Sequence, residues 1–326
     1  VNILHSAGAL DRIWAAPITS GGIANTHTLF NLACAVLLLP LCGLYEKLSR
    51  IVVHDDVRHS QGVEHELQLL DDKFFTSPEL ALSSSDEAIA TMARLACAGA
   101  DSAMGTLGAY DRAVIETVQE NEQSIDMLAD AVNNYLVRLS GHMEADDNSV
   151  LLNYYLQCFS EFERIGDYAV NLTESAEELH ARGAQFSTTA RQELAVLQDA
   201  LHEIMGYAAD AFTTRQASVA RHIEPVEEVI DDLVETLRAR HTRRLLDGKC
   251  TVYGGLGFLN SLTNIERIAD QCSNLGIYTI ALTDPDIART HHDYIQHLHQ
   301  GDDSFFNAEY RAAHEKYFGR LAELAG

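Results

Sequence analysis

The chain has 326 residues, of which 47% are hydrophobic and 22% charged, so it has the composition of a folded protein and not of a disordered one. Its 48 acidic residues against 23 lysines and arginines give a formal charge of −25, which argues against a nucleic-acid partner. The six cysteines show no CxxC spacing, which excludes zinc ribbons and thioredoxin-like redox chemistry.

Residues 1–54 differ from the rest of the chain, because no Asp, Glu, Lys or Arg occurs over 13–45. Within this stretch, TLFNLACAVLLLPLCGLY (28–45) is mostly apolar and lies at the short end of the length that a helix needs to cross a bilayer. Positive charges follow it, beginning with Lys47, and place the next residues in the cytoplasm. We expect a transmembrane helix over about 28–46 that ends a membrane domain. A buried core helix is the alternative.

After a linker over 55–84, apolar residues recur with the 3.6-residue period of amphipathic helices, interrupted by turn residues. The predicted helices span 85–110, 112–140, 148–182, 187–213, 223–247 and 254–282, and a helical tail occupies 284–326. Their connections are short, as is typical of neighbouring antiparallel helices. The sequence therefore predicts an all-α fold with two three-helix repeats, over 85–182 and 187–283.

Two stretches of the chain repeat the same acidic spacing, EFERIGDYAVNLTE (161–174) and NIERIADQCSNLG (264–276). Glu163, Asp167 and Asn171 recur as Glu266, Asp270 and Asn274, each 103 residues later (266 − 163, 270 − 167, 274 − 171). The preceding helix of each half carries a second acidic stripe, in which Glu122, Asp126 and Asp130 match Glu227, Asp231 and Glu235 at an offset of 105 (227 − 122). The pattern indicates a duplicated three-helix unit.

Residues four apart lie on one face of a helix, so each stripe forms a ridge of carboxylate oxygens, here at the edge of the packed face. Like charges in such a ridge repel each other, and partial burial adds a desolvation cost that a bound cation would remove. Short carboxylates and an amide on adjacent helices suit hard cations such as Mg²⁺, Mn²⁺, Fe³⁺ or Ca²⁺. A solvated acidic helix face, paired with arginines, is the alternative.

The motifs ERIGDYAVNL and ERIADQCSNLG, each preceded by an E-x-x-x-D pair, resemble the duplicated signature of PhoU-type phosphate-regulatory domains, over roughly 80–283. ANTHTLFNLACAVLLLPL (24–41) resembles the last membrane segment of bacterial sodium/phosphate cotransporters of the type II-related family. LDDKFFTSPELAL (70–82) is similar to the linker before their C-terminal PhoU-like domain. The resemblance implies a Na⁺-dependent phosphate symporter in the bacterial inner membrane, with a cytoplasmic PhoU-like domain that regulates uptake.

In PhoU-type domains the E-x-x-x-D pairs hold clustered metal ions, with Fe, Mn or Mg as the expected cofactor here. Carried over to this chain, the resemblance implies metal ligands at Glu122, Asp126, Glu163, Asp167, Glu227, Asp231, Glu266 and Asp270. The cotransporters bind phosphate and Na⁺ through Gln-Ser-Ser motifs, and no such motif occurs in this chain. We therefore expect no transport by these residues alone. The implied partners are inorganic phosphate, Na⁺ and the membrane, and a homodimer is left open.

Two other functions are compatible with the sequence. The first is a PhoU-like signalling adaptor that is tethered to the membrane and takes no part in transport. The second is a carboxylate-bundle metalloenzyme. Di-iron bundles of that class carry a Glu-x-x-His motif on each of two helices, whereas Glu177-x-x-His180 has no counterpart in the second half of this chain. We therefore expect no enzymatic activity.

Overall fold

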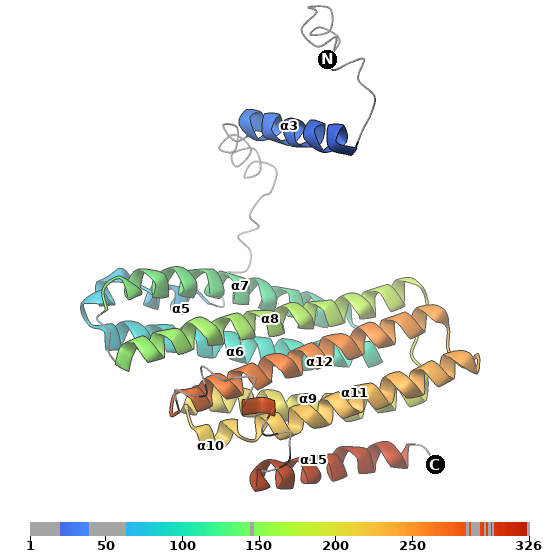
Figure 1. The fold of residues 1–326 in the computed structure, drawn as a ribbon. Coiled ribbons are helices and arrows are strands. Elements are labelled where there is room, and N and C mark those ends of the chain that lie inside the picture. Colours follow the sequence, from blue (N-terminus) through green and yellow to red (C-terminus); the bar gives the residue numbers. More distant parts are fainter. Residues whose placement is uncertain are drawn as a thin grey trace, which may run out of the picture. The chain divides into compact units, whose positions relative to one another are not determined.

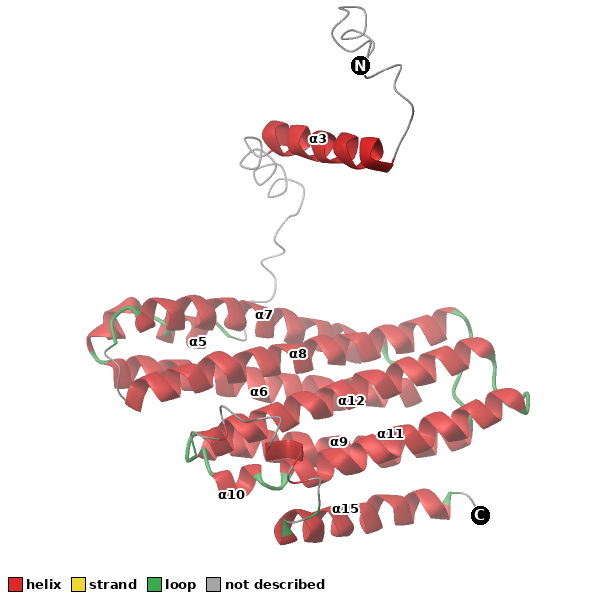
Figure 2. Ribbon diagram, in the orientation of Figure 1, coloured by secondary structure: helices red, strands yellow, loops and turns green. Residues whose placement is uncertain are grey.

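The computed structural model describes residues 20–38, 63–143, 147–284, 287, 294–296, 298, 301 and 303–324. Every regular element among these residues is a helix (Figure 2), which confirms the predicted all-α class. The chain divides into two compact units, Val1–Arg58 and His59–Gly326.

The first unit contains α3, Ser20–Leu38, which begins eight residues before the predicted transmembrane helix. His27 and Asn31 interrupt its apolar sequence, and the Asn31 amide donates a hydrogen bond to His27 Nδ1 at 3.2 Å. Among the described residues, no helix is long and apolar enough to cross a bilayer. The structure thus describes no transmembrane helix within 28–46, and residues 39–46 of that prediction lie outside the described part.

The second unit begins with a bundle of three long helices (Figure 1). They are α6 (Pro78–Gly108), α7 (Arg112–Ser140) and α8 (Asp147–Ala181). The helix α6 starts seven residues before the predicted 85, because Pro78 occupies its first turn, where a missing N–H costs no hydrogen bond. Asp111 caps α7, accepting a hydrogen bond from the Ala113 backbone N–H at 2.9 Å.

A second bundle repeats this arrangement with α9 (Thr188–Thr214), α11 (Ile223–Leu246) and α12 (Val252–Ala281), and a short α10 (Ala217–Ala220) precedes α11. Ser187 caps α9 through the Ala190 N–H, and Thr251 caps α12 through the Gly254 N–H, both at 3.1 Å. Apart from the start of α6, the ends of all six long helices lie within two residues of the predicted ones.

Further short elements pack on the two bundles. The predicted linker 55–84, described from Val63 onward, forms α5 (Glu64–Leu69), the 3-10 helix η3 (Asp72–Thr76) and the first turns of α6. Phe75 of η3 is buried, with its ring centroid 5.0 Å from that of Tyr135 in α7. In the predicted tail, α15 (Ser304–Glu323) packs on α9 and α11 and buries Tyr317.

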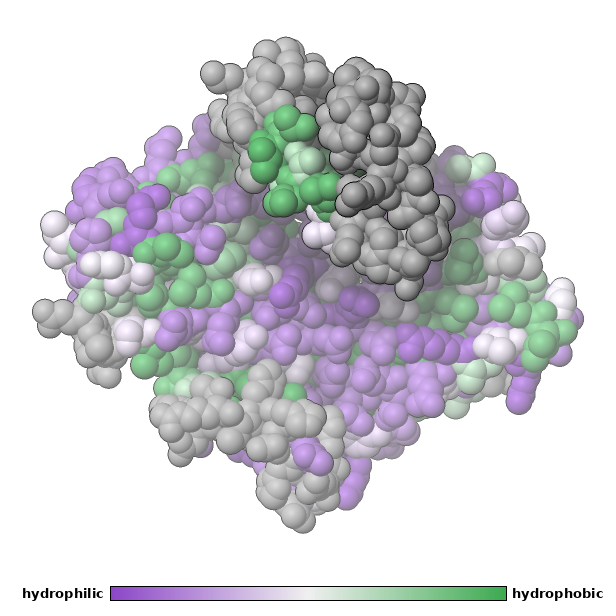
Figure 3. Space-filling model, turned by 45° about the horizontal axis from the view of Figure 1, so that its top comes forward, coloured by the Kyte–Doolittle hydropathy of each residue, from purple (hydrophilic) through white to green (hydrophobic). Residues whose placement is uncertain are grey.

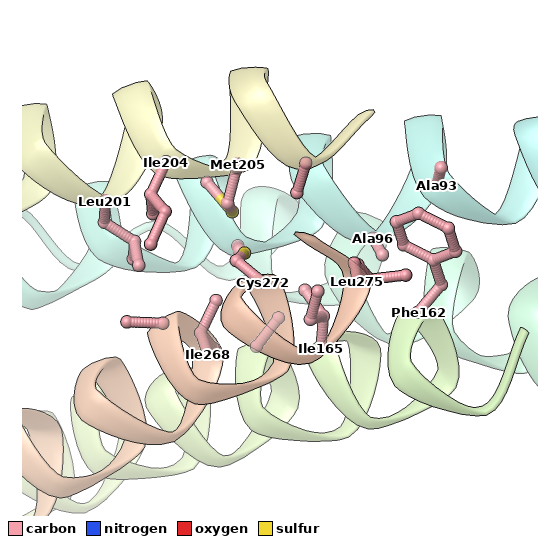
Figure 4. Close-up of a cluster of buried hydrophobic side chains, with 14 of the residues drawn as sticks. Ala93, Ala96, Phe162, Ile165, Leu201, Ile204, Met205, Ile268, Cys272 and Leu275 are labelled. Atoms are coloured by element: carbon pink, nitrogen blue, oxygen red, sulfur yellow. The ribbon is translucent and has the colours of Figure 1, made fainter. Parts of the chain in front are cut away.

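The two bundles share one hydrophobic core, in which α8 and α12 lie side by side (Figure 1). Figure 4 shows this core, to which α6, α8, α9 and α12 contribute side chains. The labelled residues are Ala93, Ala96, Phe162, Ile165, Leu201, Ile204, Met205, Ile268, Cys272 and Leu275. Polar contacts also join α8 to α12, since the Tyr278 hydroxyl donates to Glu161 Oε1 at 3.0 Å. The third helices of the two repeats are thus fixed against each other.

Candidate metal centres

The second and third helices of the first repeat bring three predicted ligands together. Glu122 and Asp126 come from α7 and Asp167 from α8, and one carboxylate oxygen of each lies within 4.8 Å of the others. We call this group centre 1. Gly166 allows the two helices to approach here, because a Cβ at this position would lie 3.0 Å from Ile125 Cδ1 in α7.

The second repeat builds the same arrangement, centre 2, from the three corresponding residues. Glu227 and Asp231 of α11 meet Asp270 of α12, again with one carboxylate oxygen of each within 4.8 Å of the others. Six of the eight predicted ligands are therefore gathered into two equivalent triads. The remaining two, Glu163 and Glu266, are not part of either triad.

In centre 1, Glu122 is partly buried, whereas Asp126 and Asp167 are more exposed. Burial, together with repulsion from Asp126 and Asp167, raises the pKa of Glu122 to about 7. Burial is also the main cause of the raised pKa values of Asp126 and Asp167. Repulsion between neighbouring carboxyl groups thus adds to the cost of burial at this centre.

Centre 2 is more deeply buried. The Glu227 side chain is 8% exposed, and burial together with Glu224, Asp231 and Asp270 raises its pKa to about 10. Burial and the charges of Glu266 and Asp270 raise the pKa of Asp231 to about 7. The Asp231 Oδ1 atom is buried without a hydrogen-bond partner. An orphaned carboxylate oxygen at the meeting point of three acids fits the oxygen-rich site of a hard cation.

Glu163 and Glu266 flank the two triads. The charges of Asp126 and Asp167, after burial, raise the pKa of Glu163, which places this carboxylate in the field of centre 1. Glu266 contributes in the same way to the raised pKa values of Asp231 and Asp270. Unlike Glu163, Glu266 forms an ion pair, with Arg238 Nη2 2.5 Å from its Oε2. The sequence offered no signal for this pair, because Arg238 lies on the preceding helix.

The arginines next to the motif acids contact other residues. Arg164 reaches Glu161 Oε2 at 3.5 Å, and Arg267 donates to the Tyr168 hydroxyl at 3.4 Å. His180 of the unmatched Glu-x-x-His stacks on Tyr110 with ring centroids 3.8 Å apart, and it belongs to neither triad. Among the ion pairs that the described residues form, only that of Glu266 fits acid–base pairing, the alternative interpretation of the acidic stripes.

Sequence reasoning missed two buried acids, Glu161 at the interface between the repeats and Glu224 within the second repeat. Glu161 is 3% exposed and accepts hydrogen bonds from Tyr278 and, at 3.4 Å, from the Asn274 amide. Glu224 accepts a hydrogen bond from the Ser273 hydroxyl at 2.5 Å. Neither recurs at the matching position of the other repeat, so the duplication pattern did not reveal them. Asn274, expected beside the metal ligands, is engaged in this interface contact.

A family model for the PhoU domain matches residues 89–176 and 194–279, which together make up more than half of the chain. The chain belongs to the PhoU domain family. The two matched segments correspond to the two repeats, and each contains one complete triad. The PhoU part of the resemblance drawn from the sequence motifs is thereby confirmed, whereas nothing in the comparisons shows a cotransporter membrane part.

Curated relatives are also PhoU homologues. The chain is 26% identical over 197 residues to a phosphate-specific transport system accessory protein PhoU homologue from Burkholderia, covering 58% of this chain and 81% of the relative. It is 21% identical over 179 residues to a homologue from Methanothermobacter thermautotrophicus, covering 55% and 81%. These relatives are accessory proteins of phosphate transport by name.

Two solved structures share the fold. The phosphate transport system regulatory protein PhoU from Streptococcus pneumoniae superposes with a TM-score of 0.57 at 19% identity, covering 64% of this chain and 98% of that one. PhoU from Pseudomonas aeruginosa gives a TM-score of 0.53 at 20% identity, covering 68% and 99%. At these identities the likeness establishes the fold alone.

Proposed function

We propose that residues 59–326 form a regulatory domain for phosphate uptake in which each PhoU repeat binds a hard metal ion at its carboxylate triad. One observation carries this proposal: the same three acids, at corresponding positions of two repeats, converge in space in both. Separate solvated acidic faces have no reason to repeat this convergence. The accessory role follows from the family and from the names of its curated relatives.

The donor set supports a hard cation such as iron, Mn²⁺ or Mg²⁺. Each centre offers carboxylate oxygens, and neither includes a sulfur or imidazole ligand. At centre 1, Glu122, Asp126 and Asp167 would hold the ion, and at centre 2, Glu227, Asp231 and Asp270. A bound cation would supply the positive charge that these partly buried acids lack, and would tie the second helix of each repeat to the third.

We assign no catalytic group among the described residues of the domain. The role that fits the centres is structural and regulatory, because the metal would stabilise a helix pair that also contributes to the interface between repeats. Asp167 lies on α8 and Asp270 on α12, and both helices also contribute side chains to the shared core. A change in metal occupancy would thereby alter how the two repeats pack against each other.

We also infer that residues 1–54 attach this domain to the membrane part of a sodium/phosphate cotransporter in a bacterial inner membrane, with the domain in the cytoplasm. The uncharged sequence over 13–45 and its similarity to the last segment of such transporters support this inference. Phosphate and Na⁺ would then bind in the preceding region. Sequencing upstream of Val1 tests the inference: further membrane spans with two Gln-Ser-Ser repeats are expected, and their absence would favour a PhoU-like adaptor.

Phosphate uptake in cells tests the regulatory role. Cells that carry the Asp167→Ala/Asp270→Ala variant in place of the natural chain should show altered uptake of labelled phosphate at high external phosphate. A variant at an exposed acid outside both centres, Glu116→Ala, should behave as the natural chain does. Unchanged uptake in the double variant, with the protein present at normal levels, would refute a regulatory role of the centres.

A further inference from the structure

Centre 2 has an arginine beside it, Arg238 of α11, at a position where the first repeat carries no charge. Its guanidinium lies 2.5 Å from Glu266 Oε2 and also donates to the Thr263 hydroxyl at 3.2 Å. Both partners are on α12, so Arg238 ties α11 to α12 next to centre 2. The ion pair is partly shielded, with the arginine side chain 38% exposed and the Glu266 side chain 31% exposed.

The first repeat has no equivalent arginine. The position 105 residues before Arg238, the offset that relates Glu122 to Glu227 (227 − 122), is occupied by Asn133. Within the described residues, Glu163, the counterpart of Glu266, forms no ion pair. Its neighbour Arg164 pairs with Glu161. The two centres therefore share three acids but differ at the fourth. Glu266 is paired with Arg238, whereas Glu163 forms no ion pair among the described residues.

A second observation at centre 2 points to a ligand. Glu227 is 92% buried, and its carboxyl group forms no hydrogen bond or ion pair with the residues that the structure describes. One of its oxygens lies within 4.8 Å of oxygens from Asp231 and Asp270. Arg238 is committed to Glu266 and Thr263. Among the described residues, no lysine or arginine forms an ion pair with the three acids of centre 2, although the charge of Arg267 acts on Asp270.

We propose that Arg238 occupies the place of a cation at Glu266, so that centre 2 binds metal through three carboxylates while centre 1 recruits Glu163 as a fourth and binds metal more tightly. This inference rests on the proposed metal-binding function. The affinity of oxygen-ligand sites rises with the number of charged ligands, and a nearby guanidinium repels a metal cation. The chain would then fill its two repeats in sequence as metal becomes available, centre 1 first.

Variants of the full chain that retain one centre each allow the comparison. Asp231→Asn/Asp270→Asn leaves centre 1, and Asp126→Asn/Asp167→Asn leaves centre 2. Titration with Mn²⁺ by calorimetry should give an affinity for centre 1 on the order of tenfold higher than for centre 2. Equal affinities, or tighter binding at centre 2, would overturn the inference.

Exchanging the distinguishing residue between repeats provides the direct test. In the chain that retains centre 2, Arg238→Asn should raise the Mn²⁺ affinity toward that of centre 1, because Glu266 is released. In the chain that retains centre 1, Asn133→Arg should lower the Mn²⁺ affinity of that centre. Circular dichroism checks that each variant folds. An Arg238→Asn variant that is folded and binds Mn²⁺ as before would contradict the inference.

A third variant keeps the test valid if Arg238→Asn does not fold. In the chain that retains centre 1, Glu163→Gln should lower the Mn²⁺ affinity on the order of tenfold, because the fourth carboxylate is lost. The neutral pair Arg238→Gln/Glu266→Gln should change the affinity of centre 2 by less than about twofold, since neither group binds metal there. No effect of Glu163→Gln would refute the inference. Absence of Mn²⁺ binding to the natural chain would refute the proposed function itself.

Discussion

At the scale of single residues, the important feature of this domain is a set of carboxyl groups that face one another, some of them buried. Glu227 is the clearest case, since it is buried among Glu224, Asp231 and Asp270, and all of them raise its pKa further after burial. Such groups destabilise a folded protein unless a ligand compensates. A bound cation, as proposed above, would account for their presence at matching positions in both repeats.

Replacing this buried acid should stabilise the metal-free protein. Glu227→Gln removes the cost of burying or protonating the carboxyl group and should raise the free energy of unfolding by about 1–3 kcal/mol. Its repeat counterpart, Glu122→Gln, serves as the matched control and should give a smaller gain, because Glu122 is less buried. Urea unfolding at pH 8 with a chelator measures both. A loss of stability in Glu227→Gln would contradict the account of this site.

The pH dependence of stability follows from the same groups. The pKa values of Glu122 and Asp231 are raised to about 7 in the folded protein from 4.5 and 3.8. The folded state therefore holds protons that the unfolded state releases, and the free energy of unfolding of metal-free protein should fall as pH rises from about 4 to about 7. Urea unfolding across this range should show the decline with chelator and a weaker one with saturating Mn²⁺. A stability that rises with pH throughout this window without metal would refute the assignment.

At the scale of helices, local sequence signals set most boundaries. Asp111, Ser187 and Thr251 each cap the helix that follows them, which is why the predicted starts of α7, α9 and α12 were close. The start of α6 was placed too late because the polar run around Ser84 looks like a loop in sequence. Its helical turns are fixed by tertiary contact, since Ala81 and Leu82 are buried in the core.

Close approach between helices predicts opposite effects of alanine at two glycines. At Gly276 of α12, a Cβ would lie 3.0 Å from Ile223 Cδ1, 3.3 Å from Ile223 Cβ and 3.4 Å from the Ala220 carbonyl oxygen. Because the Cβ and the carbonyl oxygen cannot rotate away, Gly276→Ala should destabilise the domain by about 1–2 kcal/mol. At Gly206 of α9 a Cβ would meet nothing within 4 Å, so Gly206→Ala should stabilise it by about 0.5–1 kcal/mol. Thermal unfolding measures both, and a Gly276→Ala variant as stable as the natural chain would show that α12 shifts easily here.

At the scale of the whole domain, duplication made both the fold and the candidate site predictable. The repeated spacing identified six helices and eight acids, of which six converge in the structure. Figure 3 shows that hydrophilic residues cover much of the visible face of the helical body, so exposed acids alone would not have marked the centres. These acids could be distinguished from the other acids of the chain because they recur at a nearly constant offset in the second repeat.

The features that sequence reasoning missed depend on contacts between helices. Arg238 meets Glu266 across 28 residues of sequence, and the folded position of Phe75 in the predicted linker depends on Tyr135 of α7. Neither contact produces a periodic pattern along the sequence, so neither could be predicted from it. The division of four acids per repeat into a triad and a flanking residue likewise depends on the distance between α7 and α8, which no spacing along one helix contains.

The metal content of purified residues 59–326 tests the central claim most directly, because this unit contains both centres and its own core. Elemental analysis after loading with Mn²⁺ or iron should find metal in the natural sequence. The Asp126→Asn/Asp167→Asn and Asp231→Asn/Asp270→Asn variants should each lose the share held by one centre, and the combined variant should retain none. A well-folded natural domain that holds no metal under any loading condition, or a combined variant that holds as much as the natural one, would contradict the account.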